Sequence, residues 1–500
     1  MGVIQRQSFK HSVVNFTGLA VGALSMLLLY PRVLEPYGLM SFLLGVSMLA
    51  LPVLTLGANT VALRFFPVFE DKTTGHHGLL PLLLAMCGAG CLLGAALAGL
   101  FWPQLVAGVR SPLLREYLWV AFPYAFLYVA NSVLAVYCAN FKRIVVPSIL
   151  FDLSQKLVLP LLLVGVWQGW WELGAALAGM VLHALLVLVG LALYLRSLGQ
   201  WHWRWPDWAF LTPALRREMV QFVGLGAFGG FALLMVTKLD GLMVGSVSTL
   251  TETGVYAIAV NIAAFIGVPT TSLYTASVSS VSRYLADNNL AELGSLYKKV
   301  SINLLVVGLL LLGALLTSVD ELFAILPNRG ALEVGKTALL LLGLARLVEM
   351  ATGLNNYLIY YSKYYRYSLL ALALLAAANV GLNLLLIPRF GLSGAAAATL
   401  VSITLYNVFT LVMVQQKFGL QPFTRAAPVA VLLALGVFAV VSQVPRTGWA
   451  WADLVLRSGL FAIVFAGLVL RFRLSDDMND AARKGWARAA AVFSFWKKKV

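Results

Sequence analysis

Pairs of opposite charges stand inside otherwise apolar stretches, where a charge is costly and usually faces a bundle interior or a cavity. Asp152 precedes Lys156 by four residues, and Arg346 precedes Glu349 by three. At these spacings two residues share a helix face and can form an ion pair. As a functional hypothesis, Lys156 and Arg346 bind a charged cargo, and Asp152 and Glu349 couple its transport to an ion. Structural pairing within each helix is the favoured interpretation.

A third pair cannot be explained by pairing within one helix. Lys238 and Asp240 lie only two residues apart, so they face different directions and each needs a different partner. For Asp240 we expect either a role in coupling transport to an ion or proton, or a lock on one access state. The structural alternatives are a salt bridge between lobes for Asp240 and a snorkelling side chain for Lys238.

Two motif matches do not indicate the chemistry they usually carry. Residues 330–337 read GALEVGKT, the P-loop pattern. A P-loop needs a preceding strand and access to ATP, whereas this match leads directly into an apolar segment on the expected outer side. The glycosylation sequon at Asn15 lies inside an apolar segment. His183, alone among apolar residues, is expected to be a hydrogen-bonded packing histidine in preference to a proton relay.

Enzyme, cofactor and nucleic-acid functions find no support in the chain. We see no zinc-ligand spacing, no Ser/His/Asp arrangement and no nucleic-acid motif, so we expect no catalytic site, metal, cofactor or nucleic-acid partner. The three cysteines, Cys87, Cys91 and Cys138, all sit in apolar runs. They are expected to be small buried hydrophobic residues.

The elements that position these residues are membrane helices. Hydrophobic residues make up 61% of the 500-residue chain and charged residues 11%, and the mean hydropathy is +0.88. About fourteen apolar segments are each long enough to cross a bilayer, which takes roughly 20 residues. They span residues 12–30, 39–60, 79–101, 113–139, 145–166, 173–195, 219–246, 254–281, 300–319, 334–361, 367–387, 391–414, 426–443 and 451–470.

The charge distribution orients these segments. The formal net charge is +16, and lysines and arginines in loops on the side of the termini outnumber those on the other side roughly three to one. Because cytoplasmic loops are the positive ones, both termini are expected in the cytoplasm.

The chain also repeats itself. Residues 37–71 and 253–287 each carry a glycine at the second position, Gly38 or Gly254, and a helix-interrupting proline midway, Pro52 or Pro269. We therefore expect an all-α polytopic membrane protein with two parallel six-helix lobes, at whose interface transporters commonly bind substrate. The expected divisions are an N-terminal lobe (1–200), a cytoplasmic linker (201–218), a C-terminal lobe (219–416), two further helices (417–472) and a basic amphipathic tail (473–500). The tail suits a helix on an anionic leaflet.

Several stretches in order resemble Wzx-type polysaccharide exporters. LNLLLIPRFGLSGAAAATLVS (382–402) is similar to the C-terminal signature of that family, and PRVLEPYGLMSF (31–42) to its first loop. LGANTVALRFF (56–66) and KLDGLMVGSVSTLTETGVYAIA (238–259) resemble its second-helix end and its seventh- and eighth-helix segment. Glu35 stands where the family often has glycine. The resemblance covers nearly the whole chain.

This resemblance implies a function. Wzx-type exporters are O-antigen and capsule-precursor flippases of the multidrug/oligosaccharidyl-lipid/polysaccharide superfamily. The resemblance implies a V-shaped bundle in a bacterial inner membrane that moves undecaprenyl-diphosphate-linked oligosaccharide to the periplasmic leaflet by alternating access. It also implies an aspartate at the position of Asp240. The implied partners are membrane lipids and, within the same pathway, a glycan polymerase and glycosyltransferases.

Such a cargo needs cations for its diphosphate and polar or aromatic groups for its glycan. Cations at expected helix ends or inside the bundle are Arg32, Arg64, Lys142, Arg143, Lys156, Lys238, Arg283 and Arg346. The glycan candidates are Asn15, Asn131, Asn261, Asn355, Asn356, Asn379, Asn383, Tyr357, Tyr360 and Tyr361. The alternatives are charge anchors for the cations at helix ends and interhelical hydrogen bonding for the amides.

The sequence is also compatible with three other functions. A multidrug or organic-cation exporter of the same superfamily would want an anionic cavity, which the cations near helix ends disfavour. A membrane glycan polymerase or ligase would need a substantial outer loop, and the longest outer loops here are short. A scaffold that recruits assembly enzymes is a further alternative.

Overall fold

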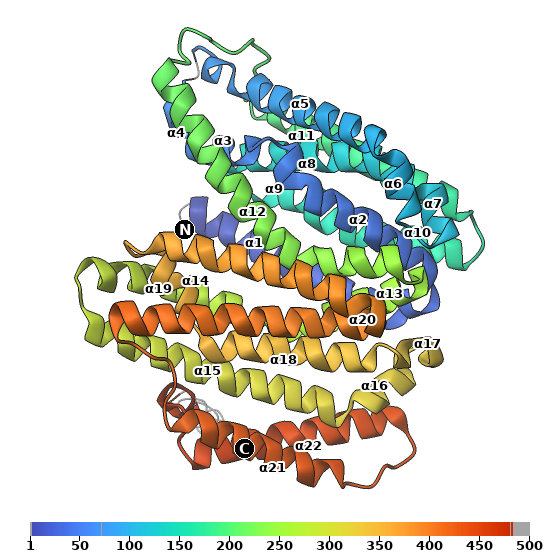
Figure 1. Cartoon of the computed structure of the whole chain (residues 1–500), viewed down its shortest axis with the longest axis vertical. Coiled ribbons are helices and arrows are strands. Elements are labelled where there is room, and N and C mark those ends of the chain that lie inside the picture. Colours follow the sequence, from blue (N-terminus) through green and yellow to red (C-terminus); the bar gives the residue numbers. More distant parts are fainter. Residues whose placement is uncertain (1–2, 72, 481, 484–500) are drawn as a thin grey trace, which may run out of the picture. The chain divides into compact units, whose positions relative to one another are not determined.

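The computed structural model describes residues 3–71, 73–480 and 482–483, and it places their side chains except at residues 3–6, 8–9, 225–233 and 236–237. Helices account for most of this part of the chain, which contains no strand (Figure 1). The expectation of an all-α polytopic membrane protein is confirmed.

The elements follow one another with short connections. The first half contains α1 (Val3–Leu28), η1 (Tyr30–Arg32), α2 (Leu34–Leu54), α3 (Ala58–Arg64), α4 (Phe66–Phe69), η2 (His76–Gly78), α5 (Leu79–Leu100), α6 (Trp102–Ala107), α7 (Pro112–Tyr117), η3 (Leu118–Val120), α8 (Ala121–Asn140), α9 (Val145–Ser148), the π-helical turn η4 (Ile149–Leu153), α10 (Ser154–Trp167), α11 (Leu173–Ser197) and α12 (Pro213–Val247). The second half contains α13 (Leu250–Ile266), α14 (Val268–Ala286), α15 (Leu290–Thr317), α16 (Val319–Ile325), α17 (Arg329–Glu333), α18 (Lys336–Thr352), α19 (Asn355–Tyr360), α20 (Tyr365–Phe418), α21 (Ala426–Ser442) and α22 (Ala450–Arg471).

The expected apolar segments fall mainly on helical residues, because hydrocarbon forces each backbone group to find a partner within its own segment. The segments 39–60, 254–281 and 334–361 cross a break between two helices. By length and composition, nine helices of the described chain could cross a membrane alone, or ten if the bent pair α13 and α14 forms one span. α20 contains two expected segments, and its backbone turns at Gly391, where φ is 55° and ψ is −134°.

The repeated prolines interrupt their helices as expected, because proline cannot donate the backbone hydrogen bond that a helix interior needs. Pro52 lies in the last turn of α2, which is followed by positive φ angles at Leu56 and Gly57. Pro269 is the second residue of α14, just after a 44° bend between α13 and α14.

The chain forms two compact units. One comprises residues 1–258 and 383–395, and the other comprises 259–382 and 396–500. The first unit therefore includes α12 and the beginning of α13 together with the N-terminal helices. The expected lobes, each of six helices, stay a prediction.

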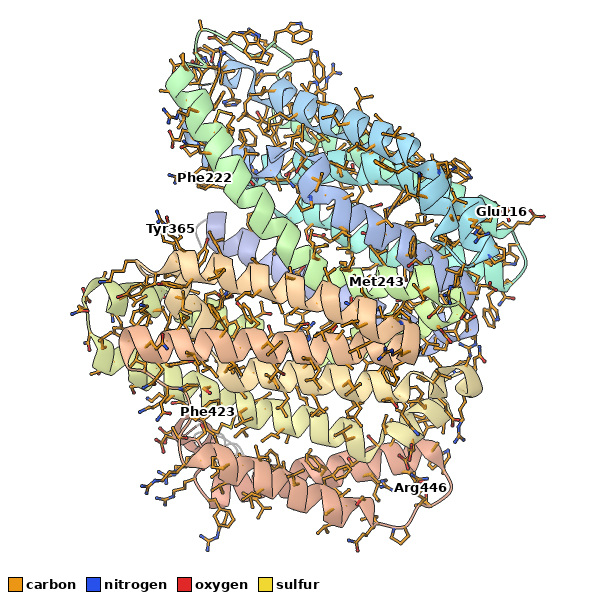
Figure 2. All side chains as sticks on the ribbon, in the orientation of Figure 1. Glu116, Phe222, Met243, Tyr365, Phe423 and Arg446 are labelled. Carbon is orange, nitrogen blue, oxygen red and sulfur yellow. The ribbon has the colours of Figure 1, made fainter. Side chains whose placement is uncertain are left out.

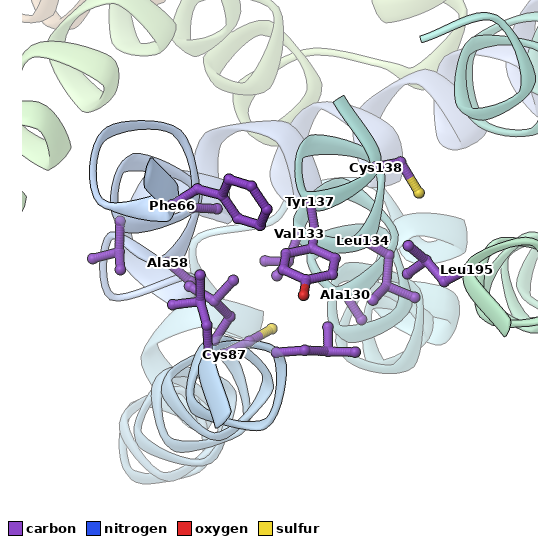
Figure 3. Packing of buried hydrophobic residues seen from close by; sticks show 14 of the residues in the cluster. Ala58, Phe66, Cys87, Ala130, Val133, Leu134, Tyr137, Cys138 and Leu195 are labelled. Carbon is purple, nitrogen blue, oxygen red and sulfur yellow. The ribbon is translucent and has the colours of Figure 1, made fainter. Parts of the chain in front are cut away.

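The core of the first unit lies among α3, α5, α8 and α11. Ala58, Cys87 and Leu195 are buried there, and the phenol of Tyr137 packs edge-on against Phe66 with ring centroids 5.9 Å apart (Figure 3). Cys87 and Cys138 are both buried free thiols, and Cys91 is partly buried, as expected for cysteines that act as hydrophobic residues.

The two repeat glycines, which the sequence only aligns, meet in space within the first unit. A Cβ atom on Gly38 of α2 would lie 2.0 Å from the carbonyl oxygen of Leu250, and one on Gly254 of α13 would lie 2.3 Å from that of Leu34. We call this contact of Gly38 with α13 and of Gly254 with α2 the glycine seam. Only residues without a side chain allow two helix backbones to approach this closely.

In the second unit, α15 packs against α14, α18, α21 and α22. The buried guanidinium of Arg457 on α22 joins three of these elements. Its Nε donates a hydrogen bond of 2.8 Å to the carbonyl of Thr317, the last residue of α15. Its terminal nitrogens lie 3.4 Å from the carbonyl oxygen of Ser442, the last residue of α21, and 3.5 Å from that of Val444. The last carbonyls of a helix have no partner within it, and Arg457 supplies one to each.

Ion pairs extend this contact toward the loop between α21 and α22. Arg446, which lies in that loop (Figure 2), places its guanidinium 2.7 Å from Asp320 and 2.9 Å from Glu321. Lys336 also pairs with Asp320. Lys336 is the lysine of the GALEVGKT match, and residues 329–333 of that region form the short helix α17. The match therefore has a helical context and a lysine engaged by a carboxylate, and the P-loop interpretation stays rejected.

Candidate functional site

The second unit carries a charged pair on α18. An Arg346 terminal nitrogen donates to a carboxylate oxygen of Glu349 at 2.9 Å, and the two side chains are 33% and 40% exposed. The expected pairing is confirmed because α18 is a regular helix on which residues three apart are neighbours. The aliphatic part of Arg346 reaches Gly267, where a Cβ atom would lie 3.6 Å from Arg346 Cδ. The pair thus lies beside the break between α13 and α14.

Tyrosines surround this pair. The hydroxyls of Tyr274, Tyr357 and Tyr406 all interact electrostatically with the carboxylate of Glu349. They come from α14, α19 and the second half of α20, so three segments distant in sequence converge on α18. The ring of Tyr274 lies 5.0 Å from that of Tyr357. We call Arg346, Glu349, Tyr274, Tyr357 and Tyr406 the tyrosine-lined site.

A break between α18 and α19 positions the site. Gly353 has φ of 63° and ψ of −128°, a conformation that residues with a side chain rarely adopt. The hydroxyl of Tyr274 donates to the freed carbonyl of Gly353 at 2.7 Å. This hydrogen bond replaces the one that the interrupted helix cannot make, so the break is held in place from α14.

Buried amides brace the same break from α20. Asn355 donates to Asn407 at 3.0 Å and to the Thr410 hydroxyl at 2.7 Å, and the Thr352 hydroxyl donates to Asn407 at 2.7 Å. The amide groups of Asn355 and Asn407 are therefore engaged in hydrogen bonds between helices. This supports the interhelical alternative for Asn355 over glycan contact.

The other expected glycan candidates divide in the same way. Asn131 donates to the Ala184 carbonyl at 2.8 Å and is buried, and Asn356 accepts from Ser368 at 2.7 Å. Tyr360 and Tyr361 are exposed, and the rings of Tyr357 and Tyr361 stack with centroids 6.3 Å apart. Asn15 is exposed on α1, while Asn379 and Asn383 are fully buried and Asn261 has partners of its own. The exposed members of the set are therefore Asn15, Asn261, Tyr360 and Tyr361, while Tyr357 and Asn356 are half-buried.

Asp240 is buried on α12 with 4% of its surface exposed. It accepts a hydrogen bond of 2.7 Å from the hydroxyl of Tyr256 and one of 2.9 Å from the backbone N–H of Gly241. Tyr256 belongs to α13, two residues after Gly254 of the glycine seam. The carboxylate is therefore tied to the helix that the seam brings against α2.

The expected pairing of Asp152 with Lys156 is wrong. Asp152 lies in the π-helical turn η4, where its carboxylate accepts from the hydroxyl of Ser148 at 2.9 Å and is thus drawn toward the preceding turn. Lys156 instead extends over Gly18 of α1, where a Cβ atom would lie 3.1 Å from Lys156 Cδ. A π-helical turn departs from the regular α-helical ladder, and such turns are frequent at functional sites.

Neither membrane lysine has a carboxylate within ion-pair distance in the described residues, although Asp240 interacts with the charge of Lys238 from farther away. Lys156 is exposed and Lys238 half-buried, and neither forms an ion pair within the described part of the chain. Each of the three membrane carboxylates on the expected helices, Asp152, Asp240 and Glu349, is engaged by a donor. Of these three carboxylates, Glu349 is balanced by an ion pair with Arg346, whereas Asp152 and Asp240 accept from neutral donors that leave their charge in place.

His183 on α11 lies 2.8 Å from the hydroxyl of Ser154 through Nε2. Beside it, Tyr124 accepts a 3.2 Å hydrogen bond from Gln155. His183, Tyr124 and Gln155 line a cavity of about 10 Å³. This volume holds roughly one water molecule. The hydrogen bond agrees with a packing histidine.

The cations at helix ends are all exposed. Arg32 lies over the ring of Trp167 at 5.1 Å, Arg64 over Phe222 at 5.4 Å and Arg283 over Tyr284 at 5.5 Å. Such cation–π contacts hold a guanidinium in place without neutralising it. Lys142 and Arg143 follow the end of α8 and form no ion pair in the described chain.

Sequence reasoning missed several members of these sites. Tyr274, Tyr406 and Asn407 were not among the expected residues, although Asn407 stands in the middle of an apolar run and could have been noticed. Tyr256 lies inside the repeat, but nothing in its local sequence indicates that it meets Asp240. Each of these contacts joins segments far apart in the chain.

No protein-family model matches the chain, and no curated protein sequence matches it. Solved structures do match. A lipid II flippase, MurJ, in an inward closed conformation has a TM-score of 0.70 at 12% identity, covering 93% of this chain and 99% of that chain. An inward-facing multidrug resistance MATE family transporter of the MOP superfamily has a TM-score of 0.61 at 14% identity, covering 84% and 98%. A variant of the Vibrio cholerae MATE transporter VcmN has a TM-score of 0.51 at 16% identity, covering 83% and 98%. The chain thus has the fold of MOP-superfamily transporters.

Proposed function

We propose that this chain is a secondary-active flippase of a bacterial inner membrane, with both termini in the cytoplasm. It moves undecaprenyl-diphosphate-linked oligosaccharide from the cytoplasmic to the periplasmic leaflet by alternating access, for assembly of O-antigen, capsule or exopolysaccharide. The similarity in fold to a flippase of a lipid-linked saccharide supports the cargo class, and the Wzx-type sequence stretches support the branch. The protein is a transporter in this proposal and not an enzyme.

The observation that carries the proposal is Lys238, a half-buried cation inside the membrane helix α12. It forms no ion pair within the described residues, and Asp240, which interacts with its charge from farther away, is hydrogen-bonded to the Tyr256 hydroxyl. A cation inside a membrane helix is costly, so it usually has a function. A diphosphate would supply the missing negative charge.

The tyrosine-lined site fits the saccharide part of such a cargo. Tyrosine rings offer flat apolar faces with a hydroxyl at the edge, and a paired arginine and carboxylate offer both donors and acceptors to sugar hydroxyls. Arg64, Lys142, Arg143 and Arg283, at exposed helix ends on the expected cytoplasmic side, would attract the diphosphate at entry. Asp240, tied to α13 through Tyr256, would couple that movement to an ion or proton.

The similarity in fold to MATE transporters supports one alternative function, which is export of organic cations. Such an exporter would bind its cargo through an available carboxylate. Asp152 is exposed and accepts from the Ser148 hydroxyl, whereas Glu349 would have to give up Arg346 to bind such a cargo.

The test is transport by the full chain in liposomes that contain undecaprenyl-diphosphate-linked oligosaccharide, scored by access of an external glycosidase to the glycan. We expect Lys238→Gln to slow translocation about tenfold or more, since a hydrogen bond to a charged group contributes about 1.5–3 kcal/mol. Lys299→Gln, at an exposed position of α15, is the matched control and should translocate normally. Absence of glycan translocation together with efflux of an organic cation would replace the proposal with the exporter.

A second prediction concerns coupling. Asp240→Asn keeps an acceptor for the Tyr256 hydroxyl but removes the charge, so transport should persist at a reduced rate that no longer responds to an imposed ion or proton gradient. The measurement is the initial rate of translocation with and without the gradient. A rate that still rises with the gradient would return Asp240 to a purely structural role.

A further inference from the structure

A groove of about 330 Å³ opens between α5, α8 and α11 of the first unit. Its wall is apolar, with Gly88 on α5, Phe126 and Leu134 on α8, and Leu188 on α11. Ala130 and Leu134 belong both to this wall and to the buried cluster beneath it (Figure 3). The floor of the groove is therefore tightly packed protein. The helices that frame its open side span the membrane.

The groove has the depth of one leaflet. Along α8 the wall runs from Phe126 to Leu134, which at 1.5 Å per residue is about 12 Å. The hydrocarbon core is about 30 Å thick, so this length corresponds to somewhat less than half of it. The wall residues of α11 lie in its last ten residues before Ser197, and Trp201 closes the groove at the same end. The groove thus occupies the half nearer the expected cytoplasmic side.

A cation stands at the open end of the groove. Leu188 and Ala192 line the wall from α11, and Arg196 follows at the same four-residue spacing, which continues the same helix face. The side chain of Arg196 is exposed and forms no ion pair within the described residues. An apolar wall that ends in an unpaired guanidinium is complementary to an anionic phospholipid, whose apolar acyl chain ends in a negatively charged headgroup.

Aromatic residues place this end at the depth of lipid headgroups. Trp203, Trp205 and Trp208 follow Trp201 in the segment between α11 and α12, and they are 63%, 86% and 62% exposed. Exposed tryptophans of membrane proteins concentrate at the level of the headgroups. The ring of Trp203 stacks on that of Trp201 with centroids 6.1 Å apart, so the same segment forms the lip of the groove.

Two acidic groups of the neighbouring loops, Asp71 and Asp207, are already engaged. Hydrogen bonds from Thr73, and then Thr74, hold the pKa of Asp71 at about 2. Asp207 accepts from the backbone N–H of Ala209 at 3.0 Å and lies 3.4 Å from His77. Neither carboxylate pairs with Arg196, so its charge remains available for a ligand.

From these observations we infer that the groove holds one acyl chain of an anionic phospholipid of the cytoplasmic leaflet, with the phosphate of that lipid at Arg196. The site is distinct from the tyrosine-lined site, which belongs to the second unit. It does not depend on which cargo the protein carries, and a bound lipid there would fill the space between α5, α8 and α11.

The test is native mass spectrometry of the full chain in detergent, titrated with phosphatidylglycerol or phosphatidylethanolamine. We expect the wild-type chain to bind one phosphatidylglycerol about fivefold more tightly than phosphatidylethanolamine, since one arginine near the surface contributes about 1 kcal/mol toward an anionic lipid. Arg196→Gln should abolish this preference. Gly88→Phe, at a position whose Cβ would meet nothing within 4 Å, should fill the groove and remove the site for both lipids.

Two control variants separate the site from general effects. Gly99→Phe fills an equally open position on the same helix α5, outside the groove, and Arg471→Gln removes an exposed arginine at the end of α22 in the other unit. Both should bind lipid as the wild type does. Equal binding of the two lipids by the wild type, or unchanged preference in Arg196→Gln, would overturn the inference. The inference would also be overturned if the groove bound a polyprenyl phosphate and Gly88→Phe blocked that binding while phosphatidylglycerol binding stayed unchanged.

Discussion

Replacing Gly38 by leucine should leave no correctly folded protein. A Cβ atom at this position would lie 2.0 Å from the carbonyl oxygen of Leu250, and the reciprocal atom on Gly254 would lie 2.3 Å from that of Leu34. Backbone carbonyls cannot rotate away as flexible side chains can, so α2 and α13 would have to separate. Overpacking of a core typically costs about 1–3 kcal/mol and occasionally more, and we expect a cost above that range here. The measurement is the yield of monodisperse protein in detergent, followed by its thermal unfolding.

The series around this position makes the prediction specific. Gly38→Ala adds the single atom that clashes and should already lower the unfolding temperature, while Gly254→Leu should match Gly38→Leu because the contact is reciprocal. Gly22→Leu on α1 is the matched control, since a Cβ there would meet nothing within 4 Å. A well-folded Gly38→Leu protein with wild-type unfolding would show that the glycine seam is not a close contact.

The glycine seam also shows how much of the fold can be predicted from the sequence. The two glycines and the two prolines were found by aligning the halves of the chain, and both prolines do interrupt their helices. Nothing in that alignment said that Gly38 and Gly254 touch, because a repeat relates two segments by symmetry without placing them in contact. Helix positions follow from hydropathy, which is local, whereas the contact is set by packing of distant segments.

The charged pairs carry the same lesson. Arg346 and Glu349 pair as their spacing predicts, since α18 is regular at both positions. Asp152 and Lys156 have an equally good spacing but do not pair, because η4 is a π-helical turn and Ser148 and Gly18 offer other contacts. Spacing decides which residues share a face only where the helix is regular.

The convergence of tyrosines on Glu349 lay beyond sequence reasoning for a related reason. Tyr274, Tyr357 and Tyr406 are separated by tens of residues, and each alone resembles an ordinary tyrosine of a membrane helix. What joins them is the break at Gly353, whose φ of 63° is a property of the folded backbone. Candidate cations could be named from the sequence, but the choice among them required knowing which carboxylates were already engaged.

Exchanging the charges of the pair on α18 should separate its structural role from its functional one. In the variant Arg346→Glu with Glu349→Arg, the ion pair can re-form at the same spacing, so the protein should unfold close to the wild-type temperature. The carboxylate, however, moves one turn away from Tyr274, Tyr357 and Tyr406, and the cation takes its place. If the tyrosine-lined site binds the cargo in its present polarity, we expect translocation to fall at least tenfold while the fold survives. The measurement is transport in liposomes beside thermal unfolding of the same preparation.

Single substitutions and a matched pair complete this experiment. Arg346→Met leaves Glu349 without its partner, and an uncompensated charge in a membrane helix costs about 2.5–3.5 kcal/mol on insertion scales, less for a group as exposed as this one. It should therefore lose both stability and transport, which the exchanged pair should not. The pair Arg329 and Glu333 on α17, joined at 2.9 Å but 60% and 47% exposed, is the control, and its exchange should change neither property. An exchanged α18 pair that transports at the wild-type rate would mean that the pair only holds α18 in place, and that the cargo is bound elsewhere.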